Sequence, residues 1–523
     1  MTLALAPTSE IITDSTAVAA KHDFHSDGVK YRSDIDLPKV ASESSDTDVD
    51  RARVVLQHMR ATGLDVIHCT GRGYFIYEGG IWAEDDNNQR LSQVCHEVGD
   101  MVERLSQQEF ASVQASSDKD SRQDHIGRAI AISKSALPYK RDNTVKSTID
   151  TIAKLAEVQT VKTDDLDRDL DVLAVANGIV DLRTGELDKW NRHELITAQV
   201  PFIYDDAEPA DCPRWRAFLD DVLVTENGET DHELVEYVQR LVGYGITGHT
   251  SEQMFAVLHG IGANGKGVFT ETLAHVFGAV ARTTGFATFE ARRDDSTPPV
   301  ARLAGSRLVF ASEGDSSKPI DSALIKRLTG QDRIEARHLY REPFEFTPRF
   351  LVILSTNHRP NVRDHSEGYW RRIKLIPFRR YFEEHERDRS IHQALREESE
   401  GILAWAIEGA RKWHESGLQT PAVIEAETQD YRETQDRLAE YVTTWLDITG
   451  DPNDRVKVTD VWKSYRGWCD DVIEDHPLRR NTFVNQMRAK PGVSRTLINN
   501  TQHFTGLRLR TDSQVRLAER GLG

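Results

Sequence analysis

Cysteine is scarce in this chain of 523 residues, and the four that it has exclude a zinc-ribbon or disulfide scaffold. They lie far apart, at Cys69, Cys95, Cys212 and Cys469, and fit neither metal-ligand nor disulfide spacing. No apolar run approaches membrane-spanning length, and the first residues lack a basic start followed by an apolar core. We therefore expect a protein of the reducing cytoplasm that has no membrane partner.

Basic residues are also in the minority, since 66 Lys and Arg face 84 Asp and Glu, which gives a formal net charge of −18. This balance argues against a protein whose whole surface is coated by nucleic acid. It leaves room for a local basic channel, because contact with DNA depends on where the charge lies. The length allows about three domains.

A glycine-rich turn follows a short apolar run at Met254–His259 and precedes an amphipathic pattern, which predicts strand, turn and helix in this order. The turn and the start of the helix read Gly260-Ile-Gly262-Ala263-Asn264-Gly265-Lys266-Gly267-Val268. Gly260, Gly265 and Lys266 have the spacing of a nucleotide phosphate loop, in which backbone N–H groups surround the phosphates and the lysine reaches them. Gly267 departs from the pattern, because a Ser or Thr hydroxyl usually binds Mg²⁺ there. An ordinary glycine-rich turn with a chance lysine is the alternative.

Two predicted buried strands downstream end in polar residues. The run from Arg307 ends in the carboxylate of Glu313, which beside a phosphate loop would hold Mg²⁺ or polarise the attacking water. An acid at an ordinary strand end is the other interpretation. The run from Phe350 ends in the amide of Asn357, which can orient water or sense a γ-phosphate. Between the two runs lies a predicted helix, a glycine turn and a short basic hairpin. The pair Arg371 and Arg372 precedes a further strand.

The order of these features along the chain resembles that of the superfamily 3 helicases. It is a phosphate loop, a strand-end acid, a basic hairpin, a strand-end asparagine and an arginine pair. The chain more closely resembles the helicase portion of the phage and plasmid primase-helicase family, whose relatives include the poxvirus primase-helicase. The segments that carry the resemblance to the motor are Gly262–Lys266, Lys326–Asp332 and Trp370–Arg372. Residues 177–185 and 212–215 are similar to the domain that precedes the motor in that family.

The resemblance implies an AAA+-like P-loop ATPase core that forms a ring, usually a hexamer, and moves 3′→5′ along single-stranded DNA. It implies that the loop at 260–268 binds ATP through Lys266, that Glu313 activates water and binds Mg²⁺, and that Asn357 is the sensor. Arg372, or else Arg371, would reach the nucleotide of a neighbouring subunit. The DNA-gripping residues of the pore hairpin would be Lys326, Arg333, Arg337 and His338. With Gly267 in the loop, water or Glu313 and Asp315 would complete the Mg²⁺ shell.

Four parts are expected along the chain. They are a disordered arm at 1–50, a mixed α/β support domain at 51–225, the ATPase domain at 226–420, and a helical linker with a winged-helix-like domain at 421–523. Between Pro477 and Arg510 there are basic residues, including Arg479, Arg480 and Arg488, and no Asp or Glu. This local reversal of charge indicates DNA contact. A solvated basic face or a subunit-docking module is the alternative.

In the support domain we expect a β-hairpin over residues 73–83 and helical stretches at 90–107 and about 124–158. Turns are expected at Asn177-Gly178 and Thr184-Gly185 between short strands. The acidic run Asp164–Asp171 is interpreted as a solvated loop, with a metal cluster as the alternative. No primase module is recognised, so primer synthesis is not expected.

Together these features predict an ATP-dependent DNA helicase of phage or plasmid replication in a bacterial cytoplasm. Its partners would be single-stranded and forked DNA and further copies of the chain, with a separate primase or polymerase left open. Two other classes stay open: a P-loop ATPase that loads or remodels a replication complex without unwinding, and an origin-binding protein without turnover. The origin sequence, the ring size and the host are not encoded in any recognisable pattern.

Overall fold

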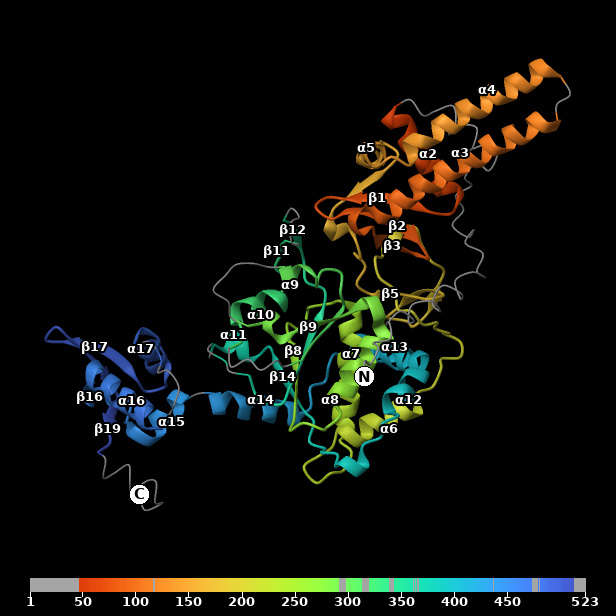
Figure 1. Cartoon of the computed structure of the whole chain (residues 1–523). Helices are drawn as coiled ribbons and strands as arrows, with labels where there is room; N and C mark the ends of the chain where they lie inside the picture. Colours follow the sequence, from red (N-terminus) through yellow and green to blue (C-terminus); the bar gives the residue numbers. More distant parts are fainter. Residues whose placement is uncertain are drawn as a thin grey trace, which may run out of the picture. The chain divides into compact units, whose positions relative to one another are not determined.

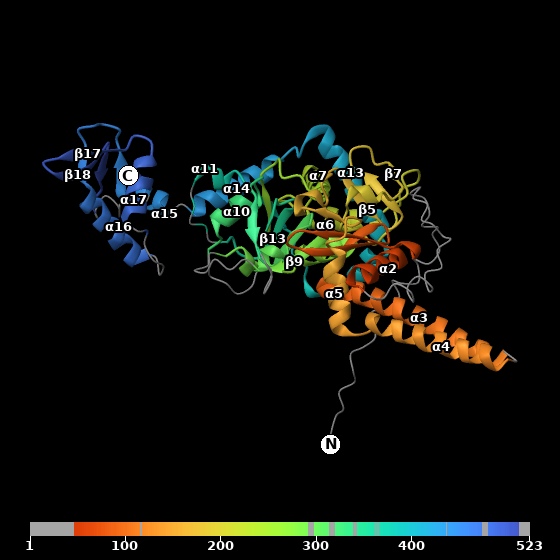
Figure 2. The ribbon, with the colours of Figure 1, turned by 90° about the horizontal axis from the view of Figure 1, so that it is seen from above.

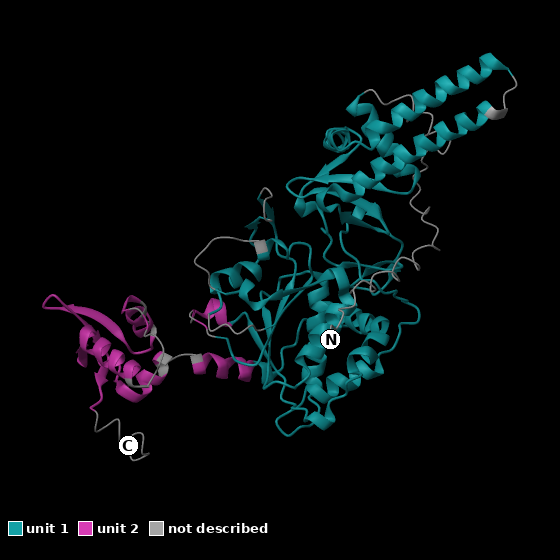
Figure 3. Cartoon of the chain, in the orientation of Figure 1, with its two compact units in different colours: residues 1–360, 371–424 teal, residues 361–370, 425–523 magenta. Residues whose placement is uncertain are grey.

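The computed structural model describes residues 47–115, 118–290, 298–312, 319–337, 343–360, 362, 364, 366–435, 437–472, 478 and 480–511. It divides into two compact units, unit 1 with residues 1–360 and 371–424 and unit 2 with residues 361–370 and 425–523 (Figure 3). Four residues to which the sequence assigned roles, Glu313, Asp315, His338 and Arg479, lie outside the described residues, as does the predicted arm up to residue 46.

Unit 1 begins with a four-stranded sheet and the helices that pack on it (Figure 1). In chain order these are α2 (Asp48–Ala61), β1 (Asp65–Cys69), β2 (Gly73–Glu78), β3 (Ile81–Glu84), α3 (Gln89–Ala115), α4 (Lys119–Ala136), α5 (Asp142–Ile152) and β4 (Gln159–Val161). The strand order is β3-β2-β1-β4, and the hairpin predicted over residues 73–83 is confirmed as β2 and β3. Helices α3 and α4 run side by side as a long antiparallel pair (Figure 2).

One helix prediction in this part is wrong. The stretch at about 124–158 is not continuous, because α4 ends at Ala136, a short 3₁₀ turn covers Leu137–Tyr139, and α5 begins at Asp142. The physical reason is Pro138, which lacks the N–H that a continuing helix needs and whose ring clashes with the preceding turn. The break was therefore readable from the sequence.

A small antiparallel sheet, β5-β6-β7, connects this first part to the centre of unit 1. Its strands are β5 (Val172–Val175), β6 (Gly178–Asp181) and β7 (Leu187–Asp188). The turns predicted at residues 177–178 and 184–185 are confirmed between them. At the second turn, the Asp181 carboxylate accepts hydrogen bonds from the backbone N–H groups of Arg183 (2.7 Å) and Thr184 (3.1 Å), which closes the chain reversal.

The acidic run at 164–171 contains no strand or α-helix, in keeping with the predicted loop, and two arginines hold its main chain. Arg349 donates to the carbonyl oxygens of Leu166 and Asp167, both at 2.7 Å. Arg307 is 7% exposed and donates to the carbonyl oxygens of residues 169, 170 and 172, and also to those of residues 246 and 247. The two arginines precede neighbouring strands, so this connecting segment is fixed to the start of the central sheet.

Five parallel strands form the central sheet of unit 1, in the order β14-β8-β13-β10-β9. They are β8 (Phe255–His259), β9 (Ala281–Gly285), β10 (Leu308–Ser312), β13 (Leu351–Thr356) and β14 (Ile373–Pro377). The central strands are almost entirely buried, as expected for a parallel sheet that is covered on both faces. The predicted α/β class is confirmed. Because the strands are parallel, all their carboxyl ends lie along one edge.

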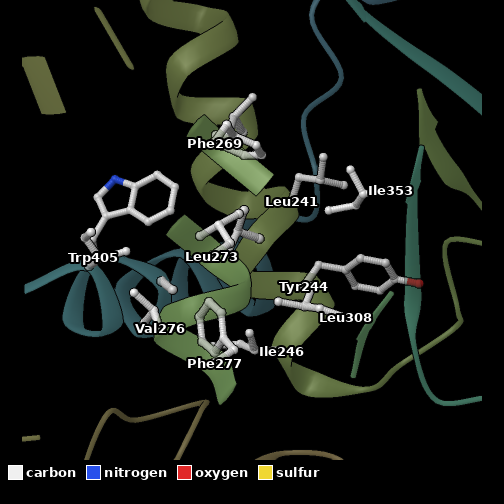
Figure 4. Close-up of a cluster of buried hydrophobic side chains, with 14 of the residues drawn as sticks. Leu241, Tyr244, Ile246, Phe269, Leu273, Val276, Phe277, Leu308, Ile353 and Trp405 are labelled. Carbon is white, nitrogen blue, oxygen red and sulfur yellow. The ribbon is translucent and has the colours of Figure 1, made fainter. Parts of the chain in front are cut away.

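Helices cover this sheet and share one apolar core with it (Figure 1). The helices that contribute to this core are α6 (Pro213–Val222), α7 (His232–Thr247), α8 (Lys266–Phe277), α12 (Ile391–Glu397) and α13 (Ser399–Ser416). The other elements of this part are α9 (Pro298–Ala301), α10 (Ser322–Leu328), β11 (Ile334–Ala336) and β12 (Phe344–Phe346). Phe269, Leu273 and Val276 project from α8 into this core, near Leu241 of α7 and Trp405 of α13 (Figure 4). Burying one such side chain stabilises the fold by about 1.5–3 kcal/mol. The core therefore fixes the helix that begins at Lys266.

Unit 2 has its own aromatic core, built around Tyr441, Tyr465 and Phe483. Its elements are α11 (Glu367–Trp370), most of α14 (Ala422–Gln435), α15 (Arg437–Trp445), β15 (Leu446–Ile448), β16 (Arg455–Lys457), α16 (Val458–Val472), α17 (Arg480–Ala489), β17 (Ser494–Ile498), β18 (Thr501–Thr505) and β19 (Leu507–Leu509). The strands form two sheets, β16-β18-β17 and β15-β19. In the described parts of both units, no helix is long and apolar enough to cross a membrane.

Candidate functional site

The glycine-rich turn lies at the carboxyl edge of the central sheet, between the end of β8 and the start of α8. Glycine is required at two of its positions. A Cβ on Gly260 would lie 2.2 Å from Asn264 Nδ2 and 2.3 Å from the carbonyl oxygen of Phe378. Gly265 has φ of +87°, and a Cβ there would lie 2.6 Å from Val222. The spacing of the motif thus has a steric cause in the packing around the turn.

Lys266 is buried at the first position of α8, with 4% of its surface exposed. Its Nζ donates to the carbonyl oxygen of Gly260 at 2.7 Å, to Asn264 Oδ1 at 3.0 Å and to Asn357 Oδ1 at 3.2 Å. The backbone N–H of Gly262 also donates to Asn357 Oδ1, at 3.3 Å. Two residues 91 positions apart in the chain, Lys266 and Asn357, are therefore in direct contact. A lysine ammonium beside a helix N-terminus is an arrangement that attracts phosphate.

Gly267 is not required by packing, in contrast to Gly260 and Gly265. A Cβ on Gly267 would meet Glu271 Oε1 at 3.8 Å and no closer atom, so a serine would fit. The nearby hydroxyl of Thr270 donates to the carbonyl oxygens of Lys266 (3.1 Å) and Gly267 (3.2 Å). Among the described residues no group of three or more His, Cys, Asp or Glu side chains could hold a metal ion.

A cavity of about 560 Å³ opens beside the loop. Its walls include Ala263, Gly265 and Val268 from the loop region and the side chains of Phe218 and Phe382. The backbone N–H of Phe382 donates to the carbonyl oxygen of Ala263 at 2.8 Å, which fastens this wall to the loop. Exposed basic side chains, Arg214, Arg387 and Arg389, contribute to its lining. A flat apolar group attached to a phosphate chain would fit such a cavity.

The arginine pair lies at the opposite edge of the sheet from the loop. Arg372 directly precedes β14, and β14 pairs with β8 in parallel from Ile373↔Phe255 to Pro377↔His259. Five strand residues, at about 3.3 Å each, place Arg372 roughly 16 Å from the start of the loop. The structure therefore brings Lys266, Asn264 and Asn357 together and keeps the arginine pair apart from them.

Both arginines are held by a glutamine that the sequence analysis did not single out. Arg371 Nη2 donates to Gln253 Oε1 at 2.7 Å, and Arg372 Nη2 donates to the same oxygen at 3.4 Å. Arg372 Nε donates to Thr329 Oγ1 at 3.2 Å. Burial and then the charge of Arg371 lower the pKa of Arg372, whereas Asp332 raises it. No motif marks Gln253, and Thr329 lies in the motif Lys326–Asp332 without a role that the sequence assigns, because their partners come from distant parts of the chain.

The residues predicted to contact DNA fall into two groups. In unit 1, Lys326 lies on α10, and Arg337 is exposed directly after β11. Arg333 forms ion pairs with Asp164 and with Glu345, so its charge is partly balanced within the chain. In unit 2, the predicted contacts are the exposed Arg480 and Arg488 on α17.

Comparison with known proteins shows which families and proteins this chain is similar to. The family model described as "D5 N terminal like" matches residues 52–224, and a model described as a family of unknown function matches residues 258–372. A protein of Acanthamoeba polyphaga mimivirus named "Putative helicase" is 24% identical over 445 residues, which are 75% of this chain and 44% of that protein. "Primase D5" of fowlpox virus is 25% identical over 236 residues, 43% of this chain and 29% of that protein. These matches support a primase-helicase-like family.

A solved structure, the apo form of the NrS-1 C-terminal region, aligns with 87% of this chain and 98% of its own chain, at 11% identity and a TM-score of 0.46. The chain spans less than half the length of each of the two viral relatives. Their names describe one as a putative helicase and the other as a primase.

Proposed function

We propose that this chain is an ATP-dependent DNA helicase of phage or plasmid replication that works as a ring of identical subunits. The observation that carries the proposal is the contact of Lys266 with Gly260 and Asn357 at the carboxyl edge of a parallel sheet. Ligands of open α/β sheets bind at this edge. The helicase and primase names of the relatives support the same role.

The proposed site would bind the triphosphate of ATP at residues 260–268. Lys266 would exchange its contact with the carbonyl oxygen of Gly260 for phosphate oxygens, and the first N–H groups of α8 would donate to the same phosphates. Asn357 would report the γ-phosphate through its amide. Glu313 is proposed as the acid that orients the attacking water. Mg²⁺ would offset phosphate charge.

The arginine pair supports a ring. At roughly 16 Å from the loop of its own subunit, Arg372 is too far to contact a phosphate bound there. It is on the surface that a neighbouring subunit's nucleotide could reach, and a guanidinium suits a phosphate that gains charge during transfer. We propose Arg372 as this residue, with Arg371 as its support. The hexamer and 3′→5′ direction are proposed from the family resemblance.

DNA would be gripped by the segment that contains Lys326, Arg333 and Arg337, and by unit 2. The order α16, α17 and the hairpin β17–β18 supports a winged-helix-like domain, with α17 in a DNA groove. Arg480 and Arg488 are exposed on that helix. Arg508 and Arg510 are instead paired with Asp454 and Asp447, both at 2.7 Å, so we assign these two to the fold of unit 2.

The function is tested by strand displacement on a forked duplex. We expect the wild-type protein to release phosphate from ATP, to do so faster with single-stranded DNA, and to separate the fork with ATP but not with a non-hydrolysable analogue. Hydrolysis without separation would favour a loader or remodelling ATPase. Binding to DNA without phosphate release would favour an origin-binding protein, and would refute the proposal.

The cavity beside the loop gives a second expected result, which concerns Ala217. This exposed residue of α6 lines the cavity, and a tryptophan in its place would fill the space that we assign to the base of ATP. Burial of a base against apolar walls contributes about 1.5–3 kcal/mol. Ala217→Trp should therefore weaken ATP binding roughly ten- to a hundredfold, whereas binding of inorganic tripolyphosphate should not change. Ala217→Ser is the matched control. Equal weakening of both ligands would place the base elsewhere.

A further inference from the structure

Thr329 links the proposed DNA-binding segment around α10 to Arg372, which is distant from it in the chain. It follows the last turn of α10, which carries Lys326 and Arg327, and it precedes the basic hairpin that begins at Arg333. Its side chain is 3% exposed. Its hydroxyl is within 3.2 Å of Arg372 Nε, although the two residues are 43 positions apart.

The Thr329 hydroxyl has one proton to donate, and this determines which of its hydrogen bonds it donates and which it accepts. A hydroxyl has a single proton, and here Thr329 Oγ1 donates it to the carbonyl oxygen of Ile325 at 2.8 Å. The same oxygen is then oriented as an acceptor for Arg372 Nε. A shift of the end of α10 therefore moves the oxygen that holds Arg372. Gln253, which also accepts a hydrogen bond from Arg372, lies two residues before β8 and is not part of the α10 segment.

A second contact links Arg372 to β8, the strand that leads into the phosphate loop. The backbone N–H of Phe255, the first residue of β8, donates to the carbonyl oxygen of Arg372 at 2.8 Å. The main chain of Arg372 is thus anchored to the strand that leads into the phosphate loop, while its guanidinium is anchored to Thr329. Movement at α10 would change the direction of the guanidinium more than the position of its backbone.

We propose that Thr329 is a positioning residue that transmits DNA contact at α10 and the basic hairpin to Arg372, and so sets how strongly DNA stimulates hydrolysis in the neighbouring subunit. This inference rests on the proposed function. It adds a route by which DNA bound by one subunit regulates the nucleotide site of the next. The alternative is that the Thr329 hydroxyl only caps the end of α10.

The test is the DNA dependence of phosphate release by the full chain. Thr329→Val removes the oxygen and keeps the shape, so the maximal stimulation by single-stranded DNA should fall about tenfold, as expected for loss of a hydrogen bond to a charged group. The DNA concentration at half-maximal stimulation should not change. Thr329→Ser restores the oxygen and should restore the stimulation. Arg337→Ala should show the opposite pattern to Thr329→Val. It should raise the half-maximal DNA concentration, because a phosphate contact is lost, and leave the maximal stimulation unchanged.

The outcomes separate the two proposals. If wild-type protein hydrolyses ATP with DNA stimulation and Thr329→Val is stimulated equally, Thr329 has no positioning role. A lower melting temperature of Thr329→Val with normal stimulation would likewise leave only the capping role. Gln253→Ala checks the reasoning independently, because it should lower hydrolysis with and without DNA by the same factor. If wild-type protein shows no hydrolysis, the proposed function itself fails.

Discussion

Lys266→Ala is expected to lose at least about 100-fold of its ATP hydrolysis, the loss that follows removal of one preorganised charge-stabilising group. In the structure the ammonium is buried and contacts oxygens of Gly260, Asn264 and Asn357, so no other cation can replace it without moving the loop. Phosphate release under saturating ATP, together with a direct measurement of ATP binding, would show whether binding or turnover is lost.

The matched control is Lys146→Ala, which removes an exposed lysine from α5 and should leave hydrolysis unchanged. Because Lys266 has three hydrogen-bond partners, melting of each variant must be compared with that of wild type. A Lys266→Ala protein that is folded and hydrolyses ATP at the wild-type rate would contradict the assignment of the loop.

Arg372→Ala is expected to retain ATP binding and to lose about 1,000-fold of its hydrolysis, the lower range for removal of an arginine that acts on a transferring phosphate. The residue lies at the edge of the sheet opposite the loop, so the loss should arise at the boundary between subunits. Arg371→Ala should have a smaller effect, since Arg371 is exposed and contacts the same Gln253 oxygen. Phosphate release by each variant measures both effects.

A mixing experiment locates the arginine. Subunits with Arg372→Ala still have an intact loop, and subunits with Lys266→Ala still have an intact arginine. Mixed rings should therefore regain part of the activity, because some boundaries combine both intact parts. Lack of recovery in subunits that are shown to assemble together would exclude action between subunits. A fall in melting temperature in step with activity would instead assign Arg372 to the fold, through its contacts with Thr329 and Gln253.

The sequence predicted the central strands and the loop well because these depend on local rules. Apolar runs of five or six residues predict buried strands, and the glycines at Gly260 and Gly265 predict a turn after the first of them. Both signals are local in the sequence. The contact between Lys266 and Asn357 was not itself predicted, although it fits the rule that the carboxyl ends of parallel strands share one edge. The break at Pro138 follows from an equally local rule and was missed only because the apolar pattern continues across it.

Other features could not be predicted, because their partners are backbone groups far away in the chain. Arg307 donates to carbonyl oxygens 61 and 137 positions away, and a carbonyl oxygen has no signature in a sequence. The main-chain contacts of the acidic run at 164–171 could not be predicted for the same reason, since Arg307 and Arg349 hold its carbonyl oxygens. The pairing of Gln253 with the arginine pair likewise depends on the register of β14 with β8.

The hydrogen bonds that Arg307 donates affect how unit 1 unfolds. One buried guanidinium serves carbonyl oxygens from both the 169–172 segment and the end of α7, so neither can detach without leaving a charge unsatisfied in the interior. Breaking such an arrangement typically costs about 3–5 kcal/mol. The small β5-β6-β7 sheet, the end of α7 and the start of β10 should therefore open as one cooperative unit in hydrogen exchange.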